Sequence, residues 1–232
     1  MLDNFNYRPN TTDETVLKEI LHKQAYRKKK IDFKIQEDDV WLDGGSHIGI
    51  FALYAAQNKA KKIYCYEPED DNFDLLVKNA HLIQAKTNTE IICNKVGITQ
   101  SNGFNDFTIA PNTWRHSLLT HYKKKLPTKQ IECHALDDIL KEKQDINCIK
   151  LDIEGSELEI LKHDHDFSNV KKLVFEYSFT KDRKMENFFY CVDKLSKYFD
   201  VDVQNSFHNQ SYQGIKGYWG GFIDNIVFCK QK

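Results

Sequence analysis

The sequence lacks the features that mark disordered, fibrous and membrane-spanning proteins. Ten glycines and four prolines in 232 residues are too few for a collagenous or low-complexity chain. A hydrophobic fraction of 41% with 12% aromatic residues is enough to bury a core. No apolar run approaches the roughly 20 residues of a membrane helix, and residues 1–5 do not begin a charged leader followed by an apolar stretch. These absences predict a soluble, cytoplasmic protein.

The sequence also lacks an excess of positive or negative charge, and it lacks closely spaced cysteines. The 33 lysines and arginines nearly cancel the 34 aspartates and glutamates, so nucleic acid is not an expected partner. None of the six cysteines forms the close pair that zinc sites or redox dithiols need. We expect small, buried, reduced side chains at all six positions. They are Cys65, Cys93, Cys133, Cys148, Cys191 and Cys229.

The chain is predicted to form one main domain, because no repeat and no Gly/Ser-rich or Pro-rich linker divides it. Residues 1–36 are expected to form an N-terminal helical extension, in which Thr12 can cap a helix with apolar residues at helical spacing. From residue 39 onward, short apolar runs alternate with amphipathic helical patterns. This alternation predicts an α/β fold with a mostly parallel, doubly wound sheet and helices on both faces.

The expected elements follow from these patterns. We expect strands over residues 40–43, 62–67, 90–94, 147–152, 172–177, 199–203 and 222–229, and helices over residues 48–58, 70–85, 156–163 and 185–198. An insertion at about 104–136 is expected to hold two more strands, over 104–110 and 130–136. The loop between them, residues 111–128, is long enough to suggest a functional role, and its candidate substrate residues are Trp114, Arg115, His116 and Tyr122.

Polar residues end each of the expected parallel strands. In an open parallel sheet, ligands bind beyond the carboxyl ends of the strands, so these residues are the candidates for a site. They are Asp43, Glu67, Asn94, Asp152 with Glu154, and Glu176.

A glycine-rich turn follows the first of these acids and opens a helix. The turn lacks the Lys-Ser/Thr ending of a P-loop, and Asp43 would repel a pyrophosphate but attract an ammonium or sulfonium group. Glu67 can accept hydrogen bonds from both hydroxyls of a ribose. S-adenosylmethionine carries all of these groups, while a tight turn with a helix-capping acid downstream is the purely structural alternative. The candidate turn residues are Asp43, Gly44, Gly45, Ser46, His47 and Gly49.

Five segments together resemble, in order and spacing, the FkbM family of S-adenosylmethionine-dependent methyltransferases. Family members usually have Ala where this chain has Ser46 and Asn where it has His47. The resemblance implies a class I, Rossmann-like methyltransferase fold over residues 37–232, with a seven-stranded sheet whose last strand is antiparallel. It also implies O-methylation of acceptors that are often sugars or sugar-bearing compounds, with Pro68 and Asn94 beside the cofactor. The segments are residues 43–51, Tyr66-Glu67-Pro68, Leu136-Asp137-Asp138, residues 149–157 and Val174-Phe175-Glu176.

Methyl transfer to an alcohol requires a group that removes the hydroxyl proton. We expect Asp152 to face the cofactor and act as this base, with His116 as the alternative. Glu176, on the next strand, either raises the pKa of one member of the pair or recruits a divalent metal with Asp152; Mg²⁺, Mn²⁺ and Ca²⁺ all suit such ligands. Lys150 could neutralise these carboxylates or orient the acceptor oxygen, and Glu154 is either catalytic or structural.

The predicted acceptor is a sugar or a glycosylated small molecule. Trp114 and Tyr122 offer flat apolar faces for a pyranose, and Arg115 and His116 offer polar groups for its hydroxyls. One alternative is an RNA ribose 2'-O-methyltransferase, although the lysines at 171 and 172 precede a strand and so lie at the wrong end of the sheet. The other is a non-catalytic cofactor-binding domain. The sequence does not indicate an oligomeric state.

Overall fold

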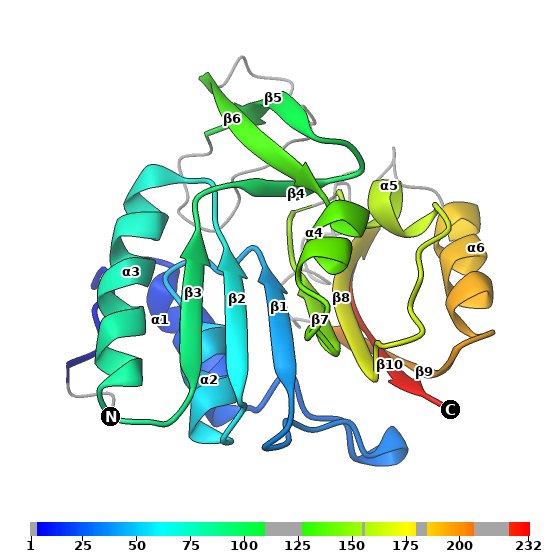
Figure 1. Cartoon of the computed structure of the whole chain (residues 1–232), viewed down its shortest axis with the longest axis horizontal. Helices are drawn as coiled ribbons and strands as arrows, with labels where there is room; N and C mark the ends of the chain where they lie inside the picture. The colour runs from blue at the N-terminus through cyan, green and yellow to red at the C-terminus, as the bar shows by residue number, and fades with distance from the viewer. Residues whose placement is uncertain (1–3, 110–126, 155, 180–184, 207–222) are drawn as a thin grey trace, which may run out of the picture.

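The centre of the protein is a seven-stranded sheet with the order β3-β2-β1-β7-β8-β10-β9 (Figure 1). The computed structural model describes residues 4–109, 127–154, 156–179, 185–206 and 223–232. β10 pairs antiparallel with both β8 and β9, whereas β3, β2, β1, β7 and β8 pair in parallel. The predicted α/β class and the antiparallel last strand are therefore confirmed. The strands are β1 (Val40–Gly44), β2 (Lys62–Tyr66), β3 (Glu90–Asn94), β7 (Cys148–Leu151), β8 (Lys172–Phe179), β9 (Phe199–Ser206) and β10 (Ile223–Gln231).

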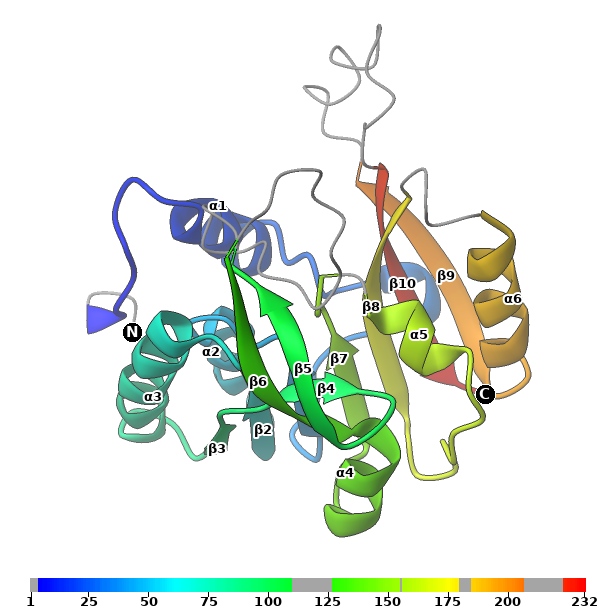
Figure 2. The same cartoon turned by 90° about the horizontal axis from the view of Figure 1, so that it is seen from above.

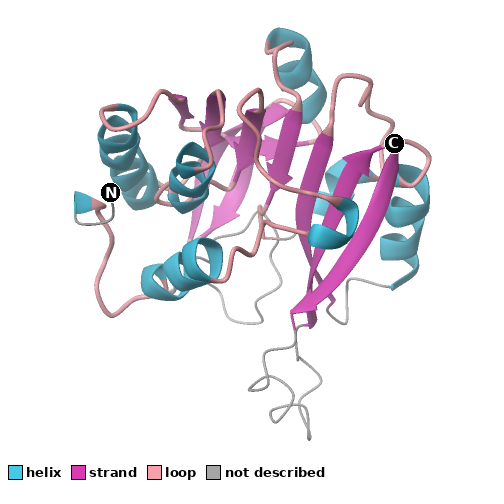
Figure 3. Cartoon of the chain, turned by 90° about the horizontal axis from the view of Figure 1, so that it is seen from below, coloured by secondary structure: helices cyan, strands magenta, loops and turns pink. Residues whose placement is uncertain are grey.

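Helices cover both faces of this sheet. Successive side chains along each strand point to opposite faces, so each face carries apolar side chains that pack against helices in a separate core. In β1, Trp41 packs in one core and its neighbours Val40 and Leu42 pack in the other. Figures 2 and 3 show the two groups of helices on either side of the sheet. None of the described helices is both long and apolar enough to cross a membrane. The first core is covered by α1 (Asp13–Leu17), α2 (Ile50–Gln57) and α3 (Asp70–Gln84), and the second by α4 (Leu136–Glu142), α5 (Glu157–Leu161) and α6 (Met185–Leu195).

A smaller sheet of three strands, in the order β4-β6-β5, lies beyond the carboxyl ends of β1, β2 and β3 (Figures 1 and 2). It consists of β4 (Gly97–Thr99), β5 (Gly103–Thr108) and β6 (Thr128–Ala135). The structure therefore places the two strands expected in the insertion, β5 and β6, at the edge of the main sheet where a ligand would bind.

Two elements of the main domain were not expected from the sequence. β4 has only three residues, too few to show an alternating pattern. α4 begins at Leu136, directly after β6 ends at Ala135. Because no turn residues separate the two elements, the expected strand over residues 130–136 included the first residue of this helix.

The N-terminal extension packs against the main domain. It contains α1, a π-helical turn (Lys18–His22) and a 3₁₀ turn (Lys29–Ile31). Thr12 precedes α1, as expected, but makes no side-chain capping bond to it. Phe5 and Phe33 are buried in the same core as α2. The extension therefore contributes apolar side chains to the core that lies behind the glycine turn.

The six cysteines are free, as expected. Five are buried, and Cys93 is half-buried. Burial raises the pKa of the Cys93 thiol to about 11, so this thiol is protonated at neutral pH.

Candidate active site

The acidic strand ends lie close together at one edge of the sheet. The strand register places Asp43 beside Lys150 of β7 and beside Cys65 of β2. Glu67 directly follows β2, and Asp152 directly follows β7. The predicted grouping of acids at the carboxyl ends of parallel strands therefore matches the topology.

The glycine turn is tied to the ends of two strands. The backbone N–H groups of Gly45 and Ser46 both donate to the Tyr66 carbonyl at 3.0 Å. The Ser46 hydroxyl donates to the Asp43 carbonyl at 2.7 Å and accepts from the Tyr66 N–H at 3.0 Å. Gly45 has φ +73°, and a Cβ atom there would lie 1.9 Å from the Asp152 carbonyl oxygen. Packing against the Asp152 backbone, just beyond β7, thus requires this glycine, and the Ser46 side chain holds the turn in place.

Lys150 is buried beneath this turn. Its Nζ lies 2.8 Å from Asp43 Oδ1, and both side chains are at least 97% buried. The same ammonium donates to the carbonyls of Gly44, at 3.3 Å, and Gly45, at 3.0 Å. Burial disfavours its charge, but Asp43 and then Asp152 outweigh burial and raise the pKa of Lys150. Lys150 is therefore a cation that fixes the turn and pairs with one oxygen, Oδ1, of Asp43.

The second oxygen of Asp43, Oδ2, is buried and has no hydrogen-bond partner among the described residues. A buried carboxylate oxygen without a partner is costly, so it marks a place where a donor or a positive group would bind favourably. The ammonium or sulfonium of S-adenosylmethionine meets this requirement. The residues at the end of β1 therefore fit the cofactor that the sequence indicates.

Glu67 holds the other side of the turn and is only 5% exposed. Its Oε2 accepts the His47 N–H at 2.8 Å, and its Oε1 accepts the Glu69 N–H at 3.0 Å. Burial raises the pKa of the Glu67 carboxyl, while these backbone donors and His47 oppose the shift. A carboxylate offers about four acceptor positions, so this group can bind ribose hydroxyls in addition to the two amides.

The remaining candidate cofactor residues support the turn and the strand ends around it. The Asn94 amide donates to the Cys65 carbonyl at 3.1 Å, and its backbone carbonyl accepts the Glu67 N–H at 3.1 Å. Gly49 has φ +88° and is the N-cap residue of α2. Pro68 is half-buried directly after Glu67.

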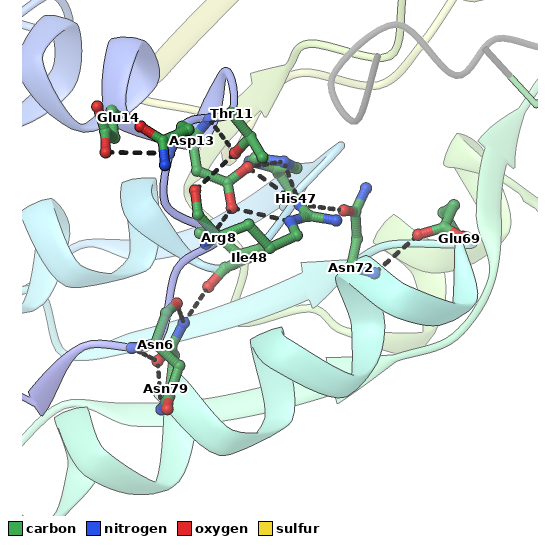
Figure 4. Close-up of polar contacts among 11 residues, drawn as sticks. Asn6, Arg8, Thr11, Asp13, Glu14, His47, Ile48, Glu69, Asn72 and Asn79 are labelled. Carbon is green, nitrogen blue, oxygen red and sulfur yellow. Dashed lines mark hydrogen bonds and ion pairs between the residues drawn. The ribbon is translucent and has the colours of Figure 1, made fainter. Parts of the chain in front are cut away.

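His47 makes contacts that the sequence did not predict (Figure 4). It adopts φ +51°, and its Nε2 lies 3.1 Å from Arg8 Nη2 and 3.2 Å from Asp13 Oδ1. Arg8 binds Asp13 through Nε and Nη2, at 2.9 and 3.0 Å, and also donates to Asn72 at 2.7 Å. Burial raises the pKa of Asp13, but hydrogen bonds from His47 and Arg8 outweigh it and hold the pKa far below its usual range. The N-terminal extension is therefore fastened to the glycine turn by half-buried Arg8 and His47 around the buried Asp13.

Asp152 is more open than Asp43 and Glu67, with a side chain 29% exposed. Its Oδ2 lies 3.9 Å from Lys150 Nζ and 3.4 Å from the Tyr26 hydroxyl. Glu176 of β8 is half-buried, and its charge, like those of Asp152 and Asp43, contributes to raising the pKa of Tyr26. The structure thus places Asp152, the expected base, beside this tyrosine.

The segment after Asp152 turns sharply. Glu154 has φ +57°, a backbone conformation that side-chain-bearing residues seldom adopt. Glu157 Oε1 accepts the Ile153 N–H at 2.8 Å, so Glu157 satisfies a backbone amide just before α5. Whether Glu154 is catalytic remains a prediction.

Several predicted residues lie outside the part of the chain that the structure describes. These are the candidate substrate residues and the alternative base, namely Trp114, Arg115, His116 and Tyr122. Within the described residues, no group of three or more His, Cys, Asp or Glu side chains is arranged to hold a metal ion.

The order of the seven strands, the antiparallel β10 and the acids at the carboxyl ends of β1 and β2 define the class I, S-adenosylmethionine-dependent methyltransferases. Comparison with known families gives the narrower assignment. The family described as "Methyltransferase FkbM domain" matches residues 43–208, which is more than half of the chain. The protein therefore belongs to the FkbM methyltransferase family.

Two curated methyltransferases are similar to part of the chain. Hexuronic acid methyltransferase AglP of Haloferax volcanii is 31% identical over 129 residues, covering 55% of this chain and 50% of that protein. Methyltransferase sdnD of Sordaria araneosa is 29% identical over 153 residues, covering 52% of this chain and 58% of that protein. The chain thus spans about half the length of the curated relatives it matches. Among solved structures, the precorrin-6y C5,15-methyltransferase of Geobacter metallireducens is 14% identical, with a TM-score of 0.46 and coverage of 99% of this chain and 95% of that chain.

Proposed function

We propose that the protein transfers a methyl group from S-adenosylmethionine to a hydroxyl of a carbohydrate or a glycosylated small molecule. The observation that carries the proposal is the division of the acids at the sheet edge. Asp43 is wholly buried and bound to Lys150, whereas Asp152, two residues beyond Lys150 along the chain, keeps a side chain 29% exposed. One acid is thus suited to hold the donor and the other to meet the acceptor.

On the donor side, Asp43 and Glu67 would hold the cofactor, the first through its unpartnered Oδ2 and the second through ribose hydroxyls. The cofactor, when bound, supplies a methyl group activated by a positively charged sulfur. Lys150 holds Asp43 and the turn carbonyls in place, so this part of the site is ordered by the protein itself. Such preorganisation lowers the cost of bringing donor and acceptor into line.

On the acceptor side, Asp152 removes a proton. As the acceptor oxygen bonds to the methyl carbon and the carbon–sulfur bond breaks, the hydroxyl proton passes to a carboxylate oxygen of Asp152. The protonated Asp152 then releases this proton to solvent, which its exposed side chain can reach. S-adenosylhomocysteine and the methyl ether are the products.

The carbohydrate acceptor is favoured over RNA by the positions of the lysines. Lys172 is buried against Asp39, with Nζ–O distances of 2.6 and 2.7 Å, and Lys171 pairs with Asp38. Both pairs lie where β8 begins, at the end of the sheet opposite Asp152. Neither lysine can join Lys150 and Asp152. The name of the relative AglP, a hexuronic acid methyltransferase, also supports a sugar.

We expect methylation of sugars to depend only weakly on salt. The test measures S-adenosylhomocysteine release with neutral sugars, uronic acids and short RNAs at about 50 and 200 mM salt, a range in which binding to a phosphate backbone weakens steeply. Turnover with a sugar at both salt concentrations supports the proposal. Methylation of RNA alone would replace it with ribose 2'-O-methylation, and no turnover with any acceptor would favour a cofactor-binding domain.

Glu67→Gln is expected to weaken S-adenosylmethionine binding by about 10- to 100-fold. The change removes a charged acceptor, and hydrogen bonds to charged groups contribute about 1.5–3 kcal/mol. Calorimetric titration measures the effect, and Asp71→Asn, which removes one exposed acid from the first turn of α3, is the control. Equal affinity in both variants would remove Glu67 from the donor site.

A further inference from the structure

Tyr26 belongs to the N-terminal extension but lies at the acidic edge of the sheet. It is 6% exposed, and its ring packs edge-on against Phe51 of α2, with 5.1 Å between centroids and an interplanar angle of 84°. This packing directs the hydroxyl to within 3.4 Å of Asp152 Oδ2. A side chain remote in sequence is thus held against the proposed base.

The surroundings of Tyr26 keep its hydroxyl protonated. Burial is the largest cause, and the charges of Asp152, Glu176 and Asp43 add to it, so the pKa of Tyr26 is raised well above its usual value. A protonated phenol among carboxylates acts as a hydrogen-bond donor. Among the described residues, the hydroxyl donates to Asp152.

The contacts with the Asp152 carboxylate are one-sided. The Tyr26 hydroxyl and the Lys150 ammonium both approach Oδ2, at 3.4 and 3.9 Å. A carboxylate whose one oxygen is fixed in this way has a defined orientation, and its other oxygen keeps its lone pairs for a proton. The geometry therefore distinguishes the oxygen that the protein holds from the oxygen that can serve as a base.

We propose that Tyr26 is a positioning residue for methyl transfer, which donates its hydroxyl hydrogen to Oδ2 of Asp152 and leaves Oδ1 facing the acceptor. The proposal rests on the proposed function, because it gives Asp152 the role of base. It also makes the N-terminal extension part of the active site, since Tyr26 belongs to that segment and contacts the Asp152 carboxylate.

The test compares Tyr26→Phe with Tyr54→Phe in the whole 232-residue chain. Tyr54 is 4% exposed on α2 and also packs near Phe51, at 6.4 Å between centroids. The control therefore removes a tyrosine hydroxyl from the same core but not from Asp152. In Tyr26→Phe, the ionised carboxylate loses a donor, and the acid limb of the kcat profile should move upward by about one pH unit. The maximal kcat should fall about tenfold, while the S-adenosylmethionine dissociation constant should stay within about twofold of wild type. Tyr54→Phe should match wild type in all three measurements.

Two outcomes would overturn this role for Tyr26. The first is a Tyr26→Phe profile that superimposes on that of Tyr54→Phe. The second is a fall in kcat without a shift of the acid limb, which would indicate a purely structural contribution. Asp152→Asn, measured alongside, separates this failure from that of the proposed function. If Asp152→Asn is inactive while Tyr26→Phe is normal, only the positioning role is lost, whereas an active Asp152→Asn removes both.

Discussion

Asp152→Asn is expected to lower kcat by about 10²–10⁴-fold, the contribution of a positioned general base. The amide keeps the size and shape of the side chain but cannot accept the hydroxyl proton. Because Asp43 and Glu67, the buried residues proposed to bind the methyl donor, are unchanged, S-adenosylmethionine affinity should remain within about twofold of wild type. Release of S-adenosylhomocysteine under saturating sugar measures the first effect, and calorimetric titration measures the second.

Two companion measurements make this result specific. Asp71→Asn removes an exposed carboxylate from α3 and should leave kcat unchanged. Glu176→Gln should resemble Asp152→Asn if the two acids work as a pair.

Repeating the wild-type assay after exhaustive chelation tests the metal hypothesis, because full activity would exclude a divalent ion at these acids. Turnover by Asp152→Asn close to that of wild type would contradict both the base and the metal roles.

Much of the fold could be predicted because each parallel strand is a short apolar run that ends at a polar residue. The expected strand over residues 90–94 coincides with β3, and the expected strand over 62–67 exceeds β2 by one residue. Burial on both faces makes such strands uniformly apolar, and this pattern is visible without an alignment. β4 could not be found, since three residues carry no periodicity.

The predictable part of the site is the part that local sequence determines. The acids at the carboxyl ends of β1, β2 and β7 could be predicted from where the apolar runs end. The turn at Gly45 could be predicted from the adjacent pair of glycines, Gly44 and Gly45. Pairing between strands depends on register, which sequence patterns define only to within a shift of the strands. The bond from Lys150 to Asp43 therefore could not be deduced, although the sequence analysis placed Lys150 among the carboxylates.

Contacts from the N-terminal extension were wholly missed. Arg8, Asp13 and Tyr26 reach the turn and Asp152 across long stretches of sequence. Nothing in their local sequence distinguishes them from ordinary polar residues of a surface helix. For Tyr26 a chemical signal exists: the carboxylates of this edge need hydrogen-bond donors, and its hydroxyl donates to Asp152.

Lys150→Met is expected to reduce the free energy of unfolding by about 3–5 kcal/mol, the usual effect of removing one partner from a buried ion pair. The substitution keeps an unbranched apolar stem, one atom shorter, but leaves Asp43 charged, wholly buried and without the ammonium at 2.8 Å. Because total stabilities are about 5–15 kcal/mol, such a loss is large. Urea denaturation monitored by circular dichroism measures it.

The protein contains two matched controls for this substitution. Lys172→Met breaks the other buried pair, with Asp39, at the opposite end of the sheet, and should cost a similar free energy without weakening S-adenosylmethionine binding. Lys171→Met breaks an exposed pair with Asp38 and should cost only about 0–1 kcal/mol. Lys150→Met alone should lower both stability and cofactor affinity, because its ammonium also holds the carbonyls of Gly44 and Gly45.

The pH dependence of stability provides an independent check on Lys150. Its pKa is raised in the folded protein above the ordinary value of 10.5, so the folded state binds the proton more tightly than the unfolded state. The stabilisation is then fully present below about pH 10.5 and is lost as pH rises through the folded value. Wild-type protein should accordingly lose stability in that alkaline range more steeply than Lys150→Met. If the two proteins show parallel stability curves above pH 10, or if Lys150→Met unfolds no more easily than Lys171→Met, the ammonium does not hold the glycine turn in the way the geometry indicates.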